Sequence, residues 1–255
     1  MILNSCQSQK GCWQSPLLFY NWKMILVTGG TGFIGAYLVE HLVEMGEKVR
    51  ILTRNSNLPA KLKPFEQKIE LVLGDITDVV TLKKALTGIE FVVHLAWTTV
   101  PKNATENPVF DVQSNVIGTL HLLDQCLVEN IKKIIFISSG GTVYGTPKQI
   151  PIPETHDLMP ISAYGISKVM VEKYIQLYHH LHGLDYTIFR VANAFGEGQN
   201  TSTDIPLDDG TPTNIDFTTN SSSCGVGGCN HRTSPQPAFP QHIQSLSGYG
   251  GLAIP

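Results

Sequence analysis

The 255-residue chain lacks the features that define several large classes of protein. Only 15% of its residues are charged and the net charge is −3, so no basic excess favours nucleic acid or an anionic membrane surface as a partner. No stretch approaches the roughly 18 consecutive apolar residues that a membrane-spanning helix needs. The sequence therefore predicts neither a nucleic-acid-binding protein nor an integral membrane protein.

Cysteine is scarce and irregularly spaced. The five cysteines are Cys6, Cys12, Cys126, Cys224 and Cys229. An odd number of scattered cysteines does not suit a disulfide framework, so we expect a reducing, cytoplasmic environment. The spacing of Cys224, Cys229 and His231 is not a standard zinc arrangement, and no metal site is expected.

Three parts of the chain differ in composition. Residues 1–23 are polar and aperiodic without a clear cleavage site, which predicts a poorly ordered extension rather than a signal peptide or anchor. Residues 24–199 alternate β-branched runs with amphipathic stretches. Of the last 55 residues, 33 are Ser, Thr, Asn, Gln, Gly or Pro and five are charged. We therefore expect residues 200–255 to be a disordered or non-native tail.

The middle part predicts an α/β fold. Its strand candidates are Met24–Thr28, Val49–Thr53, Ile69–Leu73, Phe91–Leu95, Ile134–Ser138 and Tyr186–Arg190. Its helix candidates are Phe33–Met45, Val79–Leu86, Pro108–Glu129 and Ile161–His182. Strands that are apolar on both faces and alternate with helices predict a doubly wound parallel sheet, the Rossmann fold, covered on both faces.

A glycine-rich turn joins the first predicted strand to the first predicted helix. The stretch MILVTGGTGFIG places Gly29, Gly32 and Gly35 at this junction. Such a turn lets the backbone approach a pyrophosphate, and the helix then presents free N–H groups to the anion. The position of the turn predicts a dinucleotide-binding loop.

Further motifs follow in one order along residues 24–199. They are GDITD (74–78), VVHLA (92–96), SNVIGT (114–119), SSGGTVYG (138–145), YGISK (164–168) and RVANAFGEGQ (190–199). Together with the glycine turn they resemble extended short-chain dehydrogenase/reductase proteins. More narrowly, they resemble the NAD-dependent epimerase/dehydratase family, in its branch of nucleotide-sugar epimerases of the UDP-glucose 4-epimerase type.

The resemblance implies a set of residues that contact NAD(P). They are Gly29, Gly32, Phe33, Ile34, Gly35, Arg54, Asp75, Ile76, Leu95, Ala96 and Lys168. Family members often carry an acidic residue for the adenosine ribose after the second strand, where this chain has Thr53 and Arg54. The family favours NAD, whereas Arg54 offers a counter-charge to the 2′-phosphate of NADP. Asp75 and Ile76 are expected to contact the adenine.

A tyrosine and a lysine are the predicted catalytic pair. Tyr164 and Lys168 are four residues apart on a predicted helix, which puts both on one face. A nearby ammonium and a positive nicotinamide favour the phenolate, so we expect the pKa of Tyr164 to fall toward the range of a general base.

The third catalytic group in the family is a hydroxyl after the fifth strand, where Gly140 stands in this chain. We expect Ser139 to supply it, with Thr142 as the second candidate and Ser138 inside the strand. Gly140 and Gly141 also offer no carboxylates at the positions that dehydratases use, which disfavours dehydration.

Four more residues receive expectations from the resemblance. Asn115 either orders the active-site network or is a buried structural asparagine, and Asn193 is expected to contact the sugar nucleotide. His94 is expected to be a core histidine rather than a base. Trp97 replaces a small residue and is expected to narrow the nicotinamide side of the pocket.

The implied reaction is epimerisation of a nucleotide sugar through transient hydride transfer to NAD(P). Two alternatives stay open: an NAD(P)-dependent reductase or dehydrogenase of the same superfamily, and a nucleotide-binding fragment without activity. The substrate-binding region of the family has no recognisable counterpart after residue 199, so we expect a truncated chain. Helices near 106–129 and 161–182 are the expected surface of a homodimer.

Overall fold

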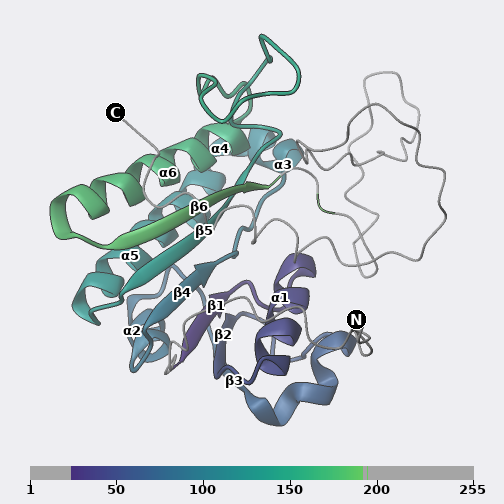
Figure 1. Ribbon diagram of the computed structural model, residues 1–255, viewed down its shortest axis with the longest axis vertical. Helices are drawn as coiled ribbons and strands as arrows, with labels where there is room; N and C mark the ends of the chain where they lie inside the picture. Colours follow the sequence, from purple (N-terminus) through teal and green to yellow (C-terminus); the bar gives the residue numbers. More distant parts are fainter. Residues whose placement is uncertain (1–23, 192–193, 195–255) are drawn as a thin grey trace, which may run out of the picture.

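The computed structural model describes residues 24–191 and 194, and a six-stranded parallel sheet forms its centre (Figure 1). The order is β3-β2-β1-β4-β5-β6, and every neighbouring pair is parallel. The strands are β1 (Ile25–Thr28), β2 (Val49–Thr53), β3 (Ile69–Leu73), β4 (Phe91–His94), β5 (Lys133–Ser139) and β6 (Asp185–Val191). This order is that of a Rossmann fold, and the predicted fold class is confirmed.

The predicted helices are present with small shifts of their ends. They are α1 (Phe33–Glu44), α2 (Val79–Leu86), α4 (Pro108–Asp111), α5 (Gly118–Val128) and α6 (Ala163–His182). The π-helical segment η2 (Val112–Ile117) joins α4 to α5, so the stretch predicted as one helix contains a change of helical pitch. π-Helical turns of this kind occur frequently at functional sites.

Two short elements escaped prediction because they carry little apolar periodicity. The 3₁₀ segment η1 (Ala60–Lys68) includes Pro64 and buries only Leu62 among its residues. Helix α3 (Pro101–Glu106) starts at a proline, which is well suited to the first turn, and buries only Ala104. Both segments are held by tertiary packing rather than by their own sequence pattern.

Different helices cover the two faces of the sheet (Figure 1), and each face carries its own apolar core. On one face α2, α5 and α6 bury residues such as Leu82, Leu122 and Val171 against the strands. On the other face α1 and η1 contribute residues such as Val39 and Leu62. Strand residues alternate between the cores, because successive side chains of a strand point to opposite faces.

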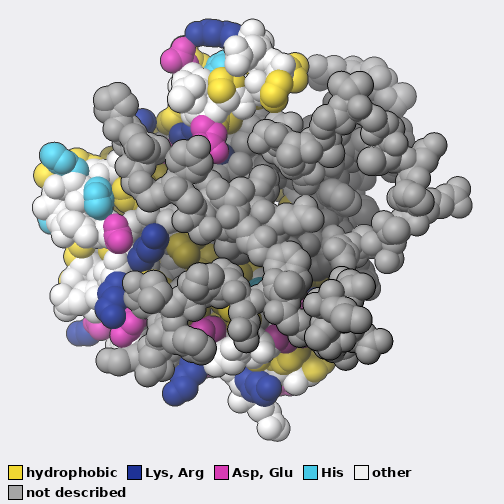
Figure 2. Space-filling view, in the orientation of Figure 1, with side chains coloured by type: hydrophobic (Ala, Val, Ile, Leu, Met, Phe, Trp, Pro, Cys, Tyr) yellow, Lys and Arg dark blue, Asp and Glu magenta, His cyan; other side chains and the backbone are white. Residues whose placement is uncertain are grey.

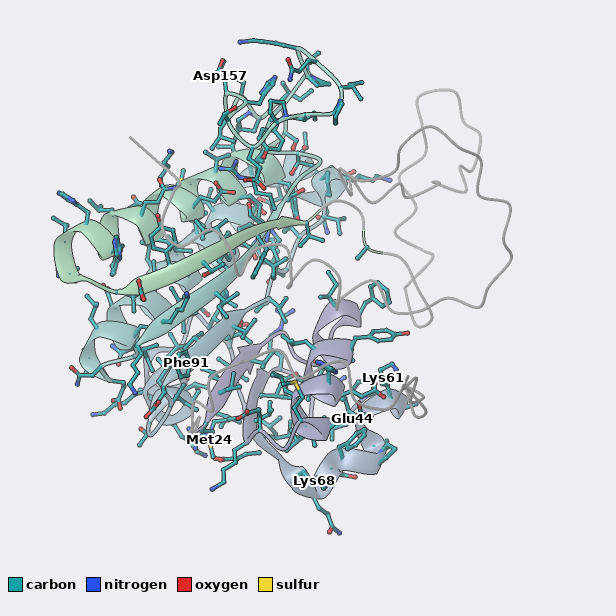
Figure 3. All side chains as sticks on the ribbon, in the orientation of Figure 1. Met24, Glu44, Lys61, Lys68, Phe91 and Asp157 are labelled. Atoms are coloured by element: carbon teal, nitrogen blue, oxygen red, sulfur yellow. The ribbon has the colours of Figure 1, made fainter. Side chains whose placement is uncertain are left out.

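The carboxyl ends of the strands share one edge of the sheet. The loop that carries Asp157 projects beyond this edge, whereas Met24 and Phe91 mark the opposite edge (Figure 3). Helix connections diverge between β1 and β4, the neighbours at the middle of the sheet. Ligands of open α/β sheets bind at such a switch point, outside the carboxyl ends of the strands.

The described surface mixes charges of both signs. Figure 2 shows basic and acidic side chains interspersed over the described part of one face. Within residues 24–191, no helix combines the length and apolar character needed to cross a bilayer. The described residues also contain no cluster of three His, Cys, Asp or Glu side chains that could hold a metal. Cys224, Cys229 and His231 lie outside the described part.

Candidate functional site

The glycine turn between β1 and α1 leaves no room for side chains. Gly29 has φ +70°, and a Cβ built there would lie 2.6 Å from the Ala96 nitrogen. A Cβ on Gly35 would lie 2.2 Å from the Gly29 oxygen. Gly32 is the N-cap of α1, whose first residues are Phe33 and Ile34. The backbone therefore forms a tight cradle at a helix N-terminus, which suits a pyrophosphate.

Two of the predicted cofactor residues pair with each other at the carboxyl ends of β2 and β3. Arg54 Nη1 lies 3.6 Å from Asp75 Oδ2, and both side chains are exposed. The other oxygen of Asp75 accepts hydrogen bonds from the amide and hydroxyl of Thr77. Ile76 is buried beside Gly118. Where family members often carry an acidic residue after the second strand, this chain thus has Arg54, and Asp75 balances part of its positive charge.

Helix α6 positions Tyr164 and Lys168. Its N-cap is Ser162, whose hydroxyl accepts a hydrogen bond from the Gly165 amide. The Lys168 Nζ donates to the Ile137 oxygen at 2.8 Å and lies 5.7 Å from the centroid of the Tyr164 ring. The two side chains are therefore neighbours on one face of the helix, as their spacing predicts.

Burial shifts the protonation of both members of this pair. Burial, followed by the negative charge of Asp111, raises the pKa of Tyr164 to about 12. Burial lowers the pKa of Lys168 to about 7, although the carboxylates of Glu172 and Asp111 oppose the change. In the chain without nucleotide, burial thus disfavours the phenolate and weakens the charge on its lysine partner. The fall in the Tyr164 pKa that is expected beside a bound nicotinamide stays a prediction.

The hydroxyl candidates after β5 lie in different surroundings. Ser138 is buried and donates to Glu172 Oε1 at 2.5 Å. Ser139 follows it in the same strand, so its side chain points to the opposite face of the sheet from α6. Thr142 Oγ1 is buried without a hydrogen-bond partner, and the Thr142 carbonyl packs against Gly165 beside Tyr164.

A buried carboxylate that the sequence analysis did not single out organises the site. Asp111 is fully buried and accepts hydrogen bonds from Thr99, Asn115 and Ser167. Asn115 Oδ1 also accepts a hydrogen bond from the Thr98 amide at 2.8 Å. Asp111 thereby ties α6 to the segment after β4. Its position four residues before Asn115, on the same helical face, is the signal that could have identified it.

Glu172, a second carboxylate that the sequence analysis missed, links α6 to the ends of β5 and β6. Glu172 is fully buried, and Arg190 Nη2 donates to it at 2.7 Å. Arg190 Nη1 also donates to the Tyr144 hydroxyl at 3.1 Å. Glu172 continues the four-residue spacing of Tyr164 and Lys168, which was a visible signal. This ion pair holds the loop after β5 against α6.

His94 is a core histidine, as expected. The Thr119 hydroxyl donates a hydrogen bond to the backbone oxygen of Asn115, and therefore accepts one from His94 Nε2 at 2.9 Å. The other ring nitrogen of His94 accepts a hydrogen bond from the Thr28 hydroxyl at 2.7 Å. Burial and then the charge of Lys168 lower the pKa of His94 to about 3. His94 is therefore neutral and joins β1 to α5. Asn193 lies outside the described residues.

Comparison with known proteins shows the family and its extent. Residues 25–207 match the NAD dependent epimerase/dehydratase family. A Methanocaldococcus jannaschii protein named as a candidate UDP-glucose 4-epimerase is 43% identical over 181 residues, which cover 69% of this chain and 57% of that protein. The chain thus spans little more than half the length of this relative.

Solved structures give the same extent. UDP-glucose 4-epimerase of Thermotoga maritima, solved with UDP-glucose, is 36% identical with a TM-score of 0.65, over 70% of this chain and 58% of that one. The Thermus thermophilus UDP-glucose 4-epimerase, solved with NAD, is 31% identical with a TM-score of 0.65, over the same shares. The glycine cradle, the Tyr164–Lys168 pair and these matches together establish that the chain belongs to the NAD dependent epimerase/dehydratase family.

Proposed function

We propose that the chain binds NAD(P) and epimerises a nucleotide sugar. The observation that carries the proposal is the Tyr164–Lys168 pair on α6, at the sheet edge that also carries the glycine cradle. The cradle fits a dinucleotide because Gly29 and Gly35 allow the backbone of the turn to pack closely, against Ala96 and within the turn itself, at the N-terminus of α1, where free N–H groups suit a pyrophosphate. When bound, the cofactor supplies hydride transfer and a positive charge near Tyr164.

In this proposal Tyr164 exchanges a proton with the sugar hydroxyl. Tyr164 carries its proton at neutral pH in the chain alone, since its pKa is about 12. Tyr164 becomes a base only when nearby positive charge stabilises its phenolate. Among the described residues, Lys168 can supply such a charge, because its Nζ lies 5.7 Å from the centroid of the Tyr164 ring. Lys168 therefore serves as the group that makes the phenolate accessible.

We propose Thr142 rather than Ser139 as the hydroxyl beside the substrate. Thr142 Oγ1 is buried and unpartnered, and a buried polar group without a partner costs about 1–3 kcal/mol. A substrate oxygen would supply that partner. Ser139, in contrast, follows Ser138 in β5 and points away from α6.

We propose NAD as the preferred cofactor. Arg54 already lies against Asp75, so a 2′-phosphate would have to compete with a carboxylate for the guanidinium. The related epimerase of T. thermophilus was solved with NAD. NADP is the alternative cofactor, and its 2′-phosphate would require Arg54 to turn away from Asp75.

The substrate is proposed to be a UDP-sugar, by analogy with the T. maritima epimerase and its bound UDP-glucose. Asn193 is the proposed contact to this substrate. Net consumption of added NADH or NADPH would instead identify a reductase, because an epimerase regenerates its cofactor. Nucleotide binding without turnover would identify a binding fragment.

Thermal unfolding of the chain with and without NAD⁺ and NADP⁺ tests the proposed binding of the nucleotide. A ligand at a hundred times its dissociation constant adds about 2.7 kcal/mol of stability, so the midpoint should rise, and more with NAD⁺. Conversion of UDP-glucose to UDP-galactose by the wild type, compared with Tyr164→Phe, tests the proposed epimerisation. An unchanged midpoint with both nucleotides overturns the proposal, as does a Tyr164→Phe variant within about tenfold of wild-type turnover.

We further propose a homodimer in the cytoplasm. Exposed apolar side chains lie on α4, α5 and α6, including Phe110, Val128, Leu177 and Leu181. Helices α4 and α5 both contact α6, and exposed apolar side chains on neighbouring helices suit contact with a second copy. A reducing compartment agrees with Cys126, which is free and buried.

A further inference from the structure

Trp97 lies beside both members of the proposed catalytic pair. The Lys168 Nζ is 3.7 Å from the centroid of the indole, and the Tyr164 ring is 5.9 Å away at an interplanar angle of 70°. The Phe136 ring also packs near the indole, with 6.0 Å between the ring centroids. The Trp97 ring thus presents its face to an ammonium while it packs on the tyrosine.

Lys168 needs this contact because its other partners are few. An ammonium has three donors, and Lys168 uses one on the Ile137 oxygen. None of the ion pairs of the described residues includes Lys168. A cation over an indole face is stabilised most strongly when water is excluded, and Lys168 is 4% exposed.

We propose that Trp97 is a positioning residue for Lys168, holding its ammonium on the indole face and setting its place beside Tyr164. The role rests on the proposed function of the Tyr164–Lys168 pair. Trp97 Nε1 is buried without a hydrogen-bond partner, so packing and the ammonium, rather than a hydrogen bond, fix the ring. Within the described part, the indole is the aromatic ring nearest to the Lys168 ammonium.

The other ionisable groups near Lys168 come from three elements. Glu172 and Tyr164 lie on α6, Asp111 on α4 and His94 on β4. The two carboxylates favour the ammonium, whereas burial opposes it and brings the pKa of Lys168 to about 7. Tyr164 and His94 titrate far from that value, at about 12 and about 3. Lys168 is therefore the neighbour of Trp97 expected to titrate near neutral pH.

Tryptophan fluorescence of the full chain between pH 5 and 9 tests this inference without any nucleotide. The emission of Trp97 is obtained by subtracting the spectrum of Trp97→Phe, which removes the signals of Trp13 and Trp22. We expect this emission to change with a midpoint near pH 7 in the wild-type background and to stay constant in Lys168→Met. A flat titration, or the same titration in Lys168→Met, would overturn the proposal.

A pair of variants separates the aromatic contact from burial alone. Trp97→Phe keeps a ring face near Lys168, whereas Trp97→Leu keeps apolar bulk without one. The pKa of Lys168, measured from the pH dependence of its reductive methylation by mass spectrometry, should be about 0.4 unit or more lower in Trp97→Leu. Equal values would overturn the proposal. If Trp97→Leu does not fold, the fluorescence comparison decides.

Failure of this contact and failure of the proposed function give different results. A chain that shows the titration of Trp97 but binds neither NAD⁺ nor NADP⁺ keeps the positioning contact and loses the epimerase assignment. A chain that binds NAD⁺ but shows no such titration keeps the assignment and loses the contact.

Discussion

At the scale of single residues, the Arg190–Glu172 pair offers the largest predicted effect on stability. Arg190→Met should lower the free energy of unfolding by about 3 kcal/mol or more, because it leaves the fully buried Glu172 carboxylate without its cation. Urea denaturation measures this change.

A matched control for this variant lies in the loop after β5. Lys148 pairs with Asp157 at 2.7 Å, the same distance as between Arg190 and Glu172. The side chains of Lys148 and Asp157, however, are both mostly exposed. Lys148→Met should therefore change stability by no more than about 1 kcal/mol. Equal losses in the two variants would show that burial does not decide the strength of these pairs.

The titration of Lys168 predicts a specific pH dependence of stability. The pKa of Lys168 falls from an ordinary value of 10.5 to about 7 on folding, so between these values the unfolded chain binds more protons. Stability must then rise with pH across this window, by at most about 1.4 kcal/mol per pH unit from this residue.

Urea denaturation at pH 7 and at pH 9.5 checks this dependence. Lys168→Met should lack the contribution, so the gain in stability between the two pH values should be smaller in the variant than in the wild type. A gain that is the same in both proteins would mean that Lys168 keeps its ordinary pKa when folded.

At the scale of secondary-structure elements, the turn between β1 and α1 should not tolerate a methyl group. Gly35→Ala places a Cβ only 2.2 Å from the Gly29 oxygen, so we expect a loss of roughly 1–3 kcal/mol and weaker binding of NAD⁺. Gly141→Ala is the control, because its Cβ would meet no atom within 4 Å. Thermal unfolding with and without NAD⁺ measures both effects, and similar behaviour of the two variants would contradict the cradle.

Sequence patterns predicted the elements that repeat a local rule. β-Branched runs identified the strands, and the glycine spacing identified the turn before α1. The patterns missed η1 and α3, because each buries a single residue and so shows no regular spacing of apolar residues. They also missed Asp111, and they placed Trp97 near the pocket without its contact to Lys168, because both residues reach α6 only through the packing of distant segments.

The burial of Tyr164 escaped prediction for a related reason. Its four-residue spacing from Lys168 gave the right neighbour, but the spacing does not report burial. The structure buries Lys168 and partly buries Tyr164, and this changes the charge that the lysine can offer. A prediction from sequence would need the packing of β4, α4 and α6 to obtain the correct direction.

At the scale of the whole molecule, the apolar helix surface predicts self-association. Leu177→Glu, on α6, should shift the chain toward monomer in size-exclusion chromatography with light scattering, because a charge would be buried at the contact. Val80→Glu on α2 is the control, since Val80 is 79% exposed and lies on another helix. A wild-type chain that is monomeric at all concentrations would exclude the proposed dimer.

The order of the sheet has a consequence for synthesis on the ribosome. Residues 25–73 contain β1, β2 and β3, which form one half of the sheet in an unbroken run of chain. The other edge of β1 pairs with β4, which ends at His94 and is made only after α2. The nascent protein therefore carries an open strand edge at what later becomes its centre, and unpaired edges favour aggregation. This edge of β1 stays open from the emergence of β3 until β4 is made.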